Sequence, residues 1–279
     1  MIVLSHFQAI PLLHARQEGR SAVSISLDLG LSRQEVRLEA EGVVLPGGQR
    51  LPWEEVDEIA RSETACFAVE GGRAVKIQRF SEFLNRFYSL MPTAGAPTLL
   101  VSGIPMHRIQ GTDPHRDTLS KIRAVAPLRG RVLDICTGLG YTAVEAARTA
   151  EQVVTIELDP AVLDIARQNP WSQDLFANPR IEQIIGDAFG IVREMEDESF
   201  SRIVHDPPRF SLAGELYAGE FYRHLHRLLE RRGRLFHYIG DPESRSGRNV
   251  TRGVMRRLQA AGFRRIVRRP RAFGLVAYK

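Results

Sequence analysis

Residues 205–210 read His-Asp-Pro-Pro-Arg-Phe and follow an apolar run directly. Two consecutive prolines hold φ at about −65° and remove two N–H donors, so the segment presents its carbonyl groups in a fixed direction. A carboxylate beside rigid carbonyls can orient an amine nitrogen and accept its proton. Asp206, Pro207 and Pro208 are therefore candidates for a clamp that holds the acceptor of a group transfer.

Two neighbours of this clamp allow two interpretations each. His205 closes the apolar run and acts either as a base or as a packed, hydrogen-bonded histidine. Phe210 either stacks on the substrate or is buried in the core. His237 and Tyr238 end a later apolar run, and they either reach the substrate at the same edge or pack inside.

Residues 132–143, Val-Leu-Asp-Ile-Cys-Thr-Gly-Leu-Gly-Tyr-Thr-Ala, place a glycine pair where a strand becomes a helix. Gly138 and Gly140 permit positive φ and remove the Cβ atoms that would keep a ligand away from the backbone. Such a turn at a helix N-terminus is typical of a nucleotide cradle, although a glycine pair alone is weak evidence. Cys136 lies inside the turn, where packing is its simplest role.

Two acids end the strands that follow the glycine turn. Glu157 comes about seventeen residues after Gly140, where a carboxylate can accept both hydroxyls of a ribose. Asp187, in Gly-Asp-Ala at 186–188, can bond an adenine amino group, while Ala188 offers a backbone amide. Because the carboxyl ends of parallel strands meet at one edge of a sheet, we expect these groups to line a single crevice.

These segments, Asp-Ile-Cys-Thr-Gly-Leu-Gly, Glu-Leu-Asp-Pro, Gly-Asp-Ala and Asp-Pro-Pro, together resemble the class I S-adenosylmethionine-dependent methyltransferases. The resemblance covers roughly residues 113–279 and implies S-adenosylmethionine as the cofactor. Asp134 would lie near its methionine end, and the glycine pair near its carboxylate and ribose. The implied cofactor-binding residues are Asp134, Thr137, Gly138, Gly140, Glu157, Leu158, Asp187 and Ala188.

The Asp-Pro-Pro segment is similar to that of enzymes that methylate amines of nucleic-acid bases. It departs from their pattern because Arg209 occupies the aromatic position and Phe210 follows one residue later, which leaves the acceptor atom open. Methylation of pyrimidine carbon 5 is disfavoured because no cysteine lies near this strand end. The missing third glycine disfavours a nicotinamide cofactor, and no cluster of ligands calls for a metal.

The pattern of elements predicts an α/β protein. From residue 116 to 279, short apolar runs alternate with amphipathic helices, which is typical of a parallel sheet covered on both faces. We expect a seven-stranded Rossmann-like methyltransferase sheet with an antiparallel last strand. A small α+β N-terminal domain (1–95), with short strands and one helix near 53–61, precedes it. Residues 96–115 form a linker or lid.

Within that linker, Arg108, His115 and Arg116 either gate the cofactor, bind substrate or serve only as a connection. The chain carries a net charge of +5, and fifteen arginines lie between Arg223 and the end against three acids. This composition favours RNA or another polyanion as a partner, although an arginine-rich solvated surface needs none. No run is long enough to span a membrane and no signal peptide is evident, so we expect a cytoplasmic protein.

The leading hypothesis is therefore an S-adenosylmethionine-dependent methyltransferase that acts on a nitrogen of an RNA base, in tRNA or rRNA. A methyltransferase for small molecules and an aminopropyltransferase of the spermidine synthase type are alternatives. Positive charge at His205 and Arg209 disfavours the polycationic substrate of the latter. A non-catalytic RNA-binding protein with the same fold is a third alternative. The acceptor, the role of the N-terminal domain and the oligomeric state stay open.

Overall fold

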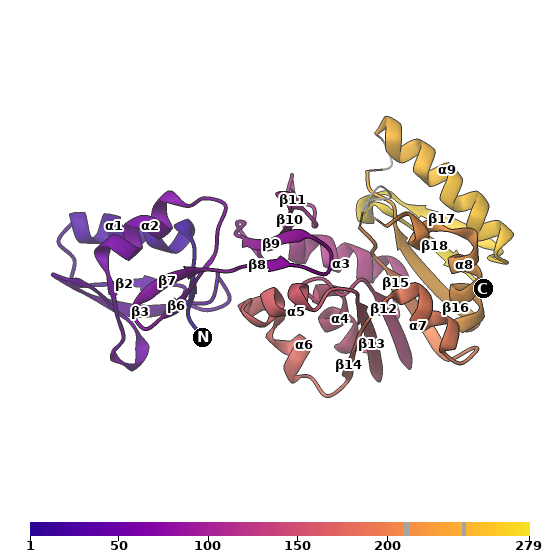
Figure 1. The fold of residues 1–279 in the computed structure, drawn as a ribbon, viewed down its shortest axis with the longest axis horizontal. Coiled ribbons are helices and arrows are strands. Elements are labelled where there is room, and N and C mark those ends of the chain that lie inside the picture. The colour runs from indigo at the N-terminus through magenta and orange to yellow at the C-terminus, as the bar shows by residue number, and fades with distance from the viewer. Residues whose placement is uncertain (209–212, 242–243) are drawn as a thin grey trace. The chain divides into compact units, whose positions relative to one another are not determined.

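The computed structural model describes residues 1–208, 213–241 and 244–279. The chain forms two compact units, one of residues 1–115 with 161–173 and one of residues 116–160 with 174–279 (Figure 1). Among the described residues, no helix has the length and apolarity needed to cross a membrane.

The first part of the chain is rich in short antiparallel strands. They form three sheets, in the orders β1-β6-β7, β2-β3-β4-β5 and β11-β10-β9-β8. The elements are β1 (Val3–Leu4), α1 (His6–Gln17), β2 (Ala22–Ile25), β3 (Gln34–Glu39), β4 (Gly42–Val44), β5 (Arg50–Pro52), α2 (Trp53–Arg61), β6 (Phe67–Glu70), β7 (Arg73–Lys76), β8 (Gln78–Ser81), β9 (Arg86–Met91), β10 (Thr98–Val101) and β11 (Ile104–Pro105).

Helix α2 lies where the sequence predicts it, but α1 was not expected from the sequence. Ser5 starts α1 with a capping box: its hydroxyl accepts from the Phe7 amide at 3.3 Å, and the Gln8 side chain accepts from the Ser5 amide at 3.0 Å. Pro11 lies inside the helix and obscured its pattern. The buried face of α1 joins the core of this part of the chain beside α2.

Strands and helices alternate in the rest of the chain, which explains its parallel sheet. The elements are α3 (Pro114–Val125), β12 (Arg131–Ile135), α4 (Tyr141–Ala147), β13 (Gln152–Glu157), α5 (Pro160–Arg167), α6 (Gln173–Ala177), β14 (Ile181–Ile185), α7 (Ala188–Glu194), β15 (Phe200–His205), α8 (Gly219–Leu228), β16 (Leu229–Tyr238), α9 (Arg245–Ala260), β17 (Arg265–Arg269) and β18 (Gly274–Tyr278).

Seven strands form one sheet in the order β14-β13-β12-β15-β16-β18-β17 (Figure 1). Strands β12 to β16 pair in parallel, while β18 pairs antiparallel with both β16 and β17. The predicted architecture is confirmed: a seven-stranded Rossmann-like sheet with an antiparallel last strand follows a small α+β part of the chain. The residues of β12, β13, β15 and β18 are almost all buried, as central strands covered on both faces require, whereas the edge strands β14 and β17 are more exposed.

The register of the sheet aligns the carboxyl ends of its central strands. Ile135, the last residue of β12, pairs with Ile156 of β13 and with His205 of β15. His205 in turn pairs with His237 of β16. The residues that follow these strand ends therefore lie along one edge of the sheet, where open α/β sheets bind their ligands.

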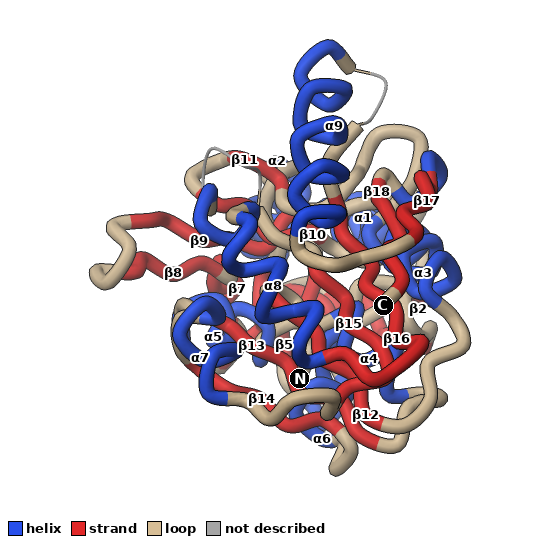
Figure 2. The backbone as a smooth tube through the Cα atoms, turned by 90° about the vertical axis from the view of Figure 1, so that its right-hand side faces the viewer, coloured by secondary structure: helices blue, strands red, loops and turns tan. Residues whose placement is uncertain are grey.

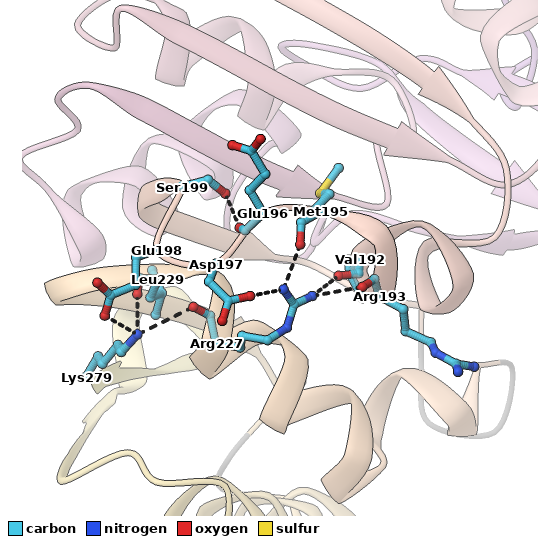
Figure 3. A network of polar contacts seen from close by, with 10 residues as sticks. All are labelled: Val192, Arg193, Met195, Glu196, Asp197, Glu198, Ser199, Arg227, Leu229 and Lys279. Carbon is cyan, nitrogen blue, oxygen red and sulfur yellow. Dashed lines mark hydrogen bonds and ion pairs between the residues drawn. The ribbon is translucent and has the colours of Figure 1, made fainter.

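At the opposite edge, a polar network fastens the segment before β15 to the end of α8 (Figure 3). The Arg227 guanidinium donates to the carbonyls of Val192 and Met195, both at 2.7 Å, and forms an ion pair with Asp197. The Arg227 side chain thus provides hydrogen-bond donors for carbonyl groups at and beyond the end of α7. The other members of the network are Arg193, Glu196, Glu198, Ser199, Leu229 and Lys279.

We expect Arg227→Ala to lower the free energy of unfolding by about 1–3 kcal/mol, because several partly buried carbonyls lose their donor. Arg223→Ala, on the exposed side of the same helix, should change it by less than about 0.5 kcal/mol. Urea unfolding of both variants measures the difference. Equal stability of the two variants would show that the network contributes nothing.

Candidate functional site

The turn after β12 has the geometry of a ligand cradle. The amides of Cys136 and Thr137 donate to the Ile156 carbonyl at 3.0 and 3.1 Å, and the Gly138 amide donates to Glu157 Oε2 at 2.8 Å. Cys136, Gly138 and Gly140 all have positive φ, of 71°, 56° and 76°. A non-glycine residue at such a φ is strained, and strain of this kind gathers at functional turns.

The two glycines of this turn differ in what a side chain would meet. A Cβ atom on Gly138 would have no neighbour within 4 Å, so open space lies above its backbone. A Cβ atom on Gly140 would lie 2.6 Å from a methyl group of Leu175. The sequence assigned both glycines to cofactor contact, but the structure also gives Gly140 a packing reason to lack a side chain.

Glu157 ends β13 beside the cradle and is 9% exposed. Its carboxylate accepts from the amides of Gly138 and Asp159, at 2.8 and 3.1 Å. Burial raises the pKa of Glu157, and these amides oppose the rise by stabilising the charged form. The carboxylate is thus held in a fixed orientation at the strand end, as a group that binds ribose hydroxyls needs to be.

Two large apolar side chains stand exposed beside Glu157. Leu158 follows it and is 40% exposed, while Ile185, which pairs with Glu157 in the sheet register, is 55% exposed. Exposed apolar side chains at strand ends that line a crevice are a natural surface for a flat heterocycle. The sequence listed Leu158 among the cofactor-binding residues without a particular contact, and that role stays a prediction; Ile185 was not singled out from the sequence.

Asp187 and Ala188 start α7 at the next strand end. The Asp187 carboxylate caps the helix by accepting from the amides of Phe189 and Gly190, at 3.0 and 3.3 Å. The side chain remains exposed, whereas Ala188 is 7% exposed. The structure thus gives Asp187 a capping role, and its predicted bond to adenine stays a prediction.

Asp134 is fully buried in β12 and belongs to a hydroxyl network. Its Oδ2 accepts from the Thr155 hydroxyl at 2.8 Å, and Thr155 lies 2.6 Å from the hydroxyl of Thr137. Burial raises the pKa of Asp134 to about 7, and the nearby charge of Asp206 adds to the rise. The hydroxyl of Thr137, predicted at the cofactor, is thus turned toward the neighbouring strand β13.

Asp206 forms an ion pair that the sequence did not reveal. Its Oδ2 lies 2.6 Å from Nζ of Lys121, which lies 2.9 Å from Oδ2 of Asp117 and 4.6 Å from the centre of the Tyr238 ring. The Lys121 and Asp117 side chains are 2% and 0% exposed, whereas Asp206 keeps 18% exposed. The buried ammonium of Lys121 is therefore in direct contact with the carboxylate of Asp206, the candidate acceptor acid.

The charges of this cluster fix its protonation. Burial alone would lower the pKa of Lys121, but Asp206 and Asp117 outweigh it and raise the pKa, so Lys121 remains an ammonium. Burial raises the pKa of Asp206, and Lys121 opposes that rise. One sequence signal could have found the contact between Asp117 and Lys121: the two are four residues apart in a segment that begins with proline, as helices often do.

The proline segment after β15 is described as far as Pro208. Pro207 is buried, and the Pro208 carbonyl accepts from the Tyr217 hydroxyl at 2.9 Å. The Pro208 carbonyl thus has one partner inside the protein, and the predicted role of the two prolines at the acceptor stays a prediction. Phe210 and Arg209, the predicted stacking ring and its neighbour, lie outside the described residues.

His205 and His237 lie in the core at the ends of β15 and β16. Both are fully buried, their ring centres are 4.5 Å apart, and each bonds an interior group: the Leu216 carbonyl for His205, the Tyr222 hydroxyl for His237. Burial lowers the pKa of His205 to about 4. A neutral, enclosed imidazole favours the packed alternative over the catalytic one. Tyr238, which ends β16 after His237, is partly exposed, unlike the two histidines.

Of the upstream candidates, His115 and Arg116 lie where α3 begins, and Arg108 lies between β11 and α3. The His115 ring lies 5.4 Å from the Trp171 ring, and Arg116 is exposed in the first turn of the helix. Residues 98–101 and 104–105, which the sequence placed in a linker or lid, are strands of a small sheet. Among the described residues, no three side chains of the types that bind metals are grouped.

Comparison with known proteins gives three kinds of match. The model of the family described as "Conserved hypothetical protein 95" matches residues 112–234. The chain is 40% identical over 263 residues to the uncharacterized protein MJ1233 of Methanocaldococcus jannaschii, which covers 92% of this chain and 89% of that protein. A spermidine synthase solved with the transition-state analogue AdoDATO has a TM-score of 0.59 at 18% identity, over 76% of this chain and 78% of its own.

Two further relatives match shorter stretches. A polyamine aminopropyltransferase of Mycobacterium tuberculosis is 34% identical over 144 residues, which cover 47% of this chain and 27% of that protein. A protein of Methanocaldococcus jannaschii named "Putative ribosomal RNA large subunit methyltransferase MJ1649" is 36% identical over 83 residues, 29% of this chain and 21% of its own length. The two names describe different reactions.

The buried Asp134 should make stability depend on pH. Its pKa is about 7 in the folded chain and near 4 in the unfolded chain, so raising the pH between these values removes a proton from the unfolded state only. Wild-type stability therefore contains a contribution that is present below about pH 4 and falls as pH rises to about 7. We expect Asp134→Asn to remove this decline, which amounts to roughly 2–4 kcal/mol.

Urea unfolding of both proteins between about pH 5 and pH 8 measures this effect. Asp174→Asn, at an exposed position, serves as the matched control and should follow the wild type. Parallel pH curves for wild type and Asp134→Asn would contradict the assignment.

Proposed function

Because the chain belongs to the family of the uncharacterized protein MJ1233 and has the Rossmann-like methyltransferase fold, we propose that it is an S-adenosylmethionine-dependent methyltransferase acting on a nitrogen of an RNA base. One observation carries the proposal: Asp206, held by the buried Lys121, lies on the same sheet edge as the glycine cradle and Glu157. A nucleoside cradle and an acceptor acid on adjacent strand ends are what such a transfer requires.

The residues of the cradle fit the cofactor. Glu157 offers a fixed carboxylate for ribose hydroxyls, Gly138 leaves open space above its backbone, and Leu158 and Ile185 expose apolar surface for adenine. When bound, S-adenosylmethionine supplies a methyl group that its sulfonium already activates. The protein therefore has to position the acceptor and exclude competing orientations, and needs no metal for this.

Asp206 is the residue that would orient the acceptor. An ionised carboxylate accepts N–H from an exocyclic amine and takes up the proton that the nitrogen releases as the new bond to carbon forms. The Lys121 ammonium, 2.6 Å away, opposes the rise of the Asp206 pKa that burial causes and so favours the ionised form. The prolines at 207 and 208 restrict the backbone that carries it.

The arginines of α9 support an RNA substrate. Helix α9 contains no acid, and Arg248, Arg252 and Arg256 recur every fourth residue, which places them on one face; all three are exposed. The guanidinium fork matches phosphate oxygens. Further exposed arginines follow in and around β17: Arg264, Arg265, Arg268 and Arg271.

A second candidate is aminopropyl transfer to a polyamine. The match to a polyamine aminopropyltransferase and the fold likeness to a spermidine synthase favour it. Against it, the candidate acceptor acid is already neutralised by Lys121, and a polycationic substrate would meet this buried cation. The two candidates share the cradle and differ at the acceptor side of the site.

The function is tested by incubating the protein with methyl-labelled S-adenosylmethionine and separate pools of tRNA, rRNA and small metabolites. A parallel reaction contains decarboxylated S-adenosylmethionine and spermidine. We expect label in an RNA pool, and RNA binding that weakens steeply with added salt. Label in small molecules alone, or an aminopropylated polyamine in the parallel reaction, would contradict the RNA assignment.

Two variants separate the acceptor from the cradle. Asp206→Asn should lower kcat about a hundredfold or more, because the proton acceptor is lost, and leave cofactor affinity nearly unchanged. Glu157→Gln should raise the Kd of the cofactor about tenfold, since a charged acceptor of hydrogen bonds is removed. Calorimetry gives the Kd and single-turnover assays give the rate. The reverse pattern would mean that the two roles are exchanged.

Lys121 should set the pH dependence of transfer. In Lys121→Met the carboxyl of Asp206 loses the charge that opposes the rise of its pKa, so the acidic limb of the kcat/KM profile should move to higher pH. Lys121→Arg keeps the charge and should stay closer to the wild type. Arg61→Met, at an exposed site at the end of α2, serves as the control. A uniform loss of rate at every pH would indicate a structural role alone.

A further inference from the structure

Strands β8 and β9 form a hairpin (Figure 2). The hairpin carries three exposed phenylalanines. Phe80, Phe83 and Phe87 are 53%, 69% and 42% exposed. Phe80 pairs directly with Phe87 in the antiparallel register, and directly opposite side chains lie on the same face of a hairpin. Two rings therefore share one face, and the third lies in the turn between the strands.

In an ordinary half-buried hairpin the large apolar side chains face the core, but in this hairpin Phe80 and Phe87 face solvent. Ser81 and Tyr88 lie on the face opposite to the Phe80–Phe87 pair and are 4% and 2% exposed. A small hydroxyl is thus buried while aromatic rings face solvent. The pairing of β9 with β10, which joins Tyr88 to Val101, fixes this register, so the exposure of the rings is built into the sheet.

The charge of the hairpin is mainly positive. Lys76, Arg79 and Arg86 lie in or beside it, against Glu82 in its turn. In the register Arg79 pairs with Tyr88 and Arg86 with Ser81, so the two arginines lie on the face opposite to the ring pair. Arg79 is about half exposed and forms an ion pair of 3.6 Å with Asp164. Exposed rings on a strand pair that also carries cations are a combination that binds single-stranded nucleic acid, because every base has a face that can stack and every linkage a phosphate.

We infer that the β8–β9 hairpin is a stacking platform for unpaired bases of an RNA that the protein binds. This inference rests on the proposed function and deepens it, because it specifies single-stranded RNA as the form that is recognised. Bases in a duplex are stacked on one another and do not offer their faces, so the platform selects loops, ends or unfolded segments.

A second copy of the chain is a less favourable occupant of this surface. The exposed parts of the three rings amount to about 300 Å², given that such side chains present 150–250 Å² each. A stable dimer buries roughly 800 Å² on each partner. Two identical hairpins would also bring their arginines and lysines together. Ring area and charge both favour a small, negatively charged, aromatic ligand.

The test uses the full chain with Phe80→Ala and Phe87→Ala combined. Fluorescence anisotropy with a labelled single-stranded RNA oligonucleotide should show a Kd at least tenfold above that of the wild type. The Kd for a blunt duplex of the same length should not change. The matched control combines Phe7→Ala and Ile10→Ala, two exposed apolar residues of α1, and should bind as the wild type does.

Replacement of both phenylalanines by tyrosine keeps the rings and should retain affinity, which separates stacking from a general effect on folding. An unchanged Kd of the alanine variant would overturn the inference. So would a wild-type dimer, seen by light scattering, that dissociates in the alanine variant, because the rings would then serve self-association.

The same assays separate this inference from the proposed function. A wild type that binds single-stranded RNA through the hairpin and transfers no methyl group would support the platform and contradict the methyltransferase assignment. A wild type that methylates RNA with an unaffected alanine variant would overturn the platform and leave the assignment standing.

Discussion

A buried lysine is the constraint on which the rest of the site depends. Lys121 has almost no contact with water, so its ammonium needs carboxylates at close range, and Asp117 and Asp206 supply them. Asp117 belongs to the same helix as Lys121, whereas Asp206 follows the central strand β15. The ion pair therefore fastens α3 to the sheet at the one point where the candidate acceptor group stands. An isolated charge there would be far more costly than the pair.

The parallel register extends this constraint to the cradle. Since β12 lies between β13 and β15, the turn that carries Gly138 is held from one side by the Glu157 carboxylate and lies next to the Asp206 end on the other. Neither acid has to be placed by a flexible loop. Both follow directly from strands whose interiors are buried, so the spacing of the two groups is as rigid as the sheet.

Much of this arrangement follows from local patterns in the sequence. Apolar runs between amphipathic segments predicted the seven strands, and the glycine pair, Glu157 and Asp206 were located because they end those runs. The pairing of Lys121 with Asp206 joins residues 85 positions apart, which no local pattern encodes. The burial of His205 depends on helix α8 and its neighbours. Helix α1 was missed because Pro11 interrupts its pattern, and the inverted face of the β8–β9 hairpin depends on its pairing with β10.

The polar network around Arg227 and Lys279 lies at the amino edge of the sheet, away from the cradle and the acceptor acid. Substitutions there act on the attachment of α8 and of the last strand, whereas those at the carboxyl edge act on the candidate site. The two ends of the same strands therefore carry separate burdens, so that cohesion of the sheet can be altered at one end without touching the cradle at the other.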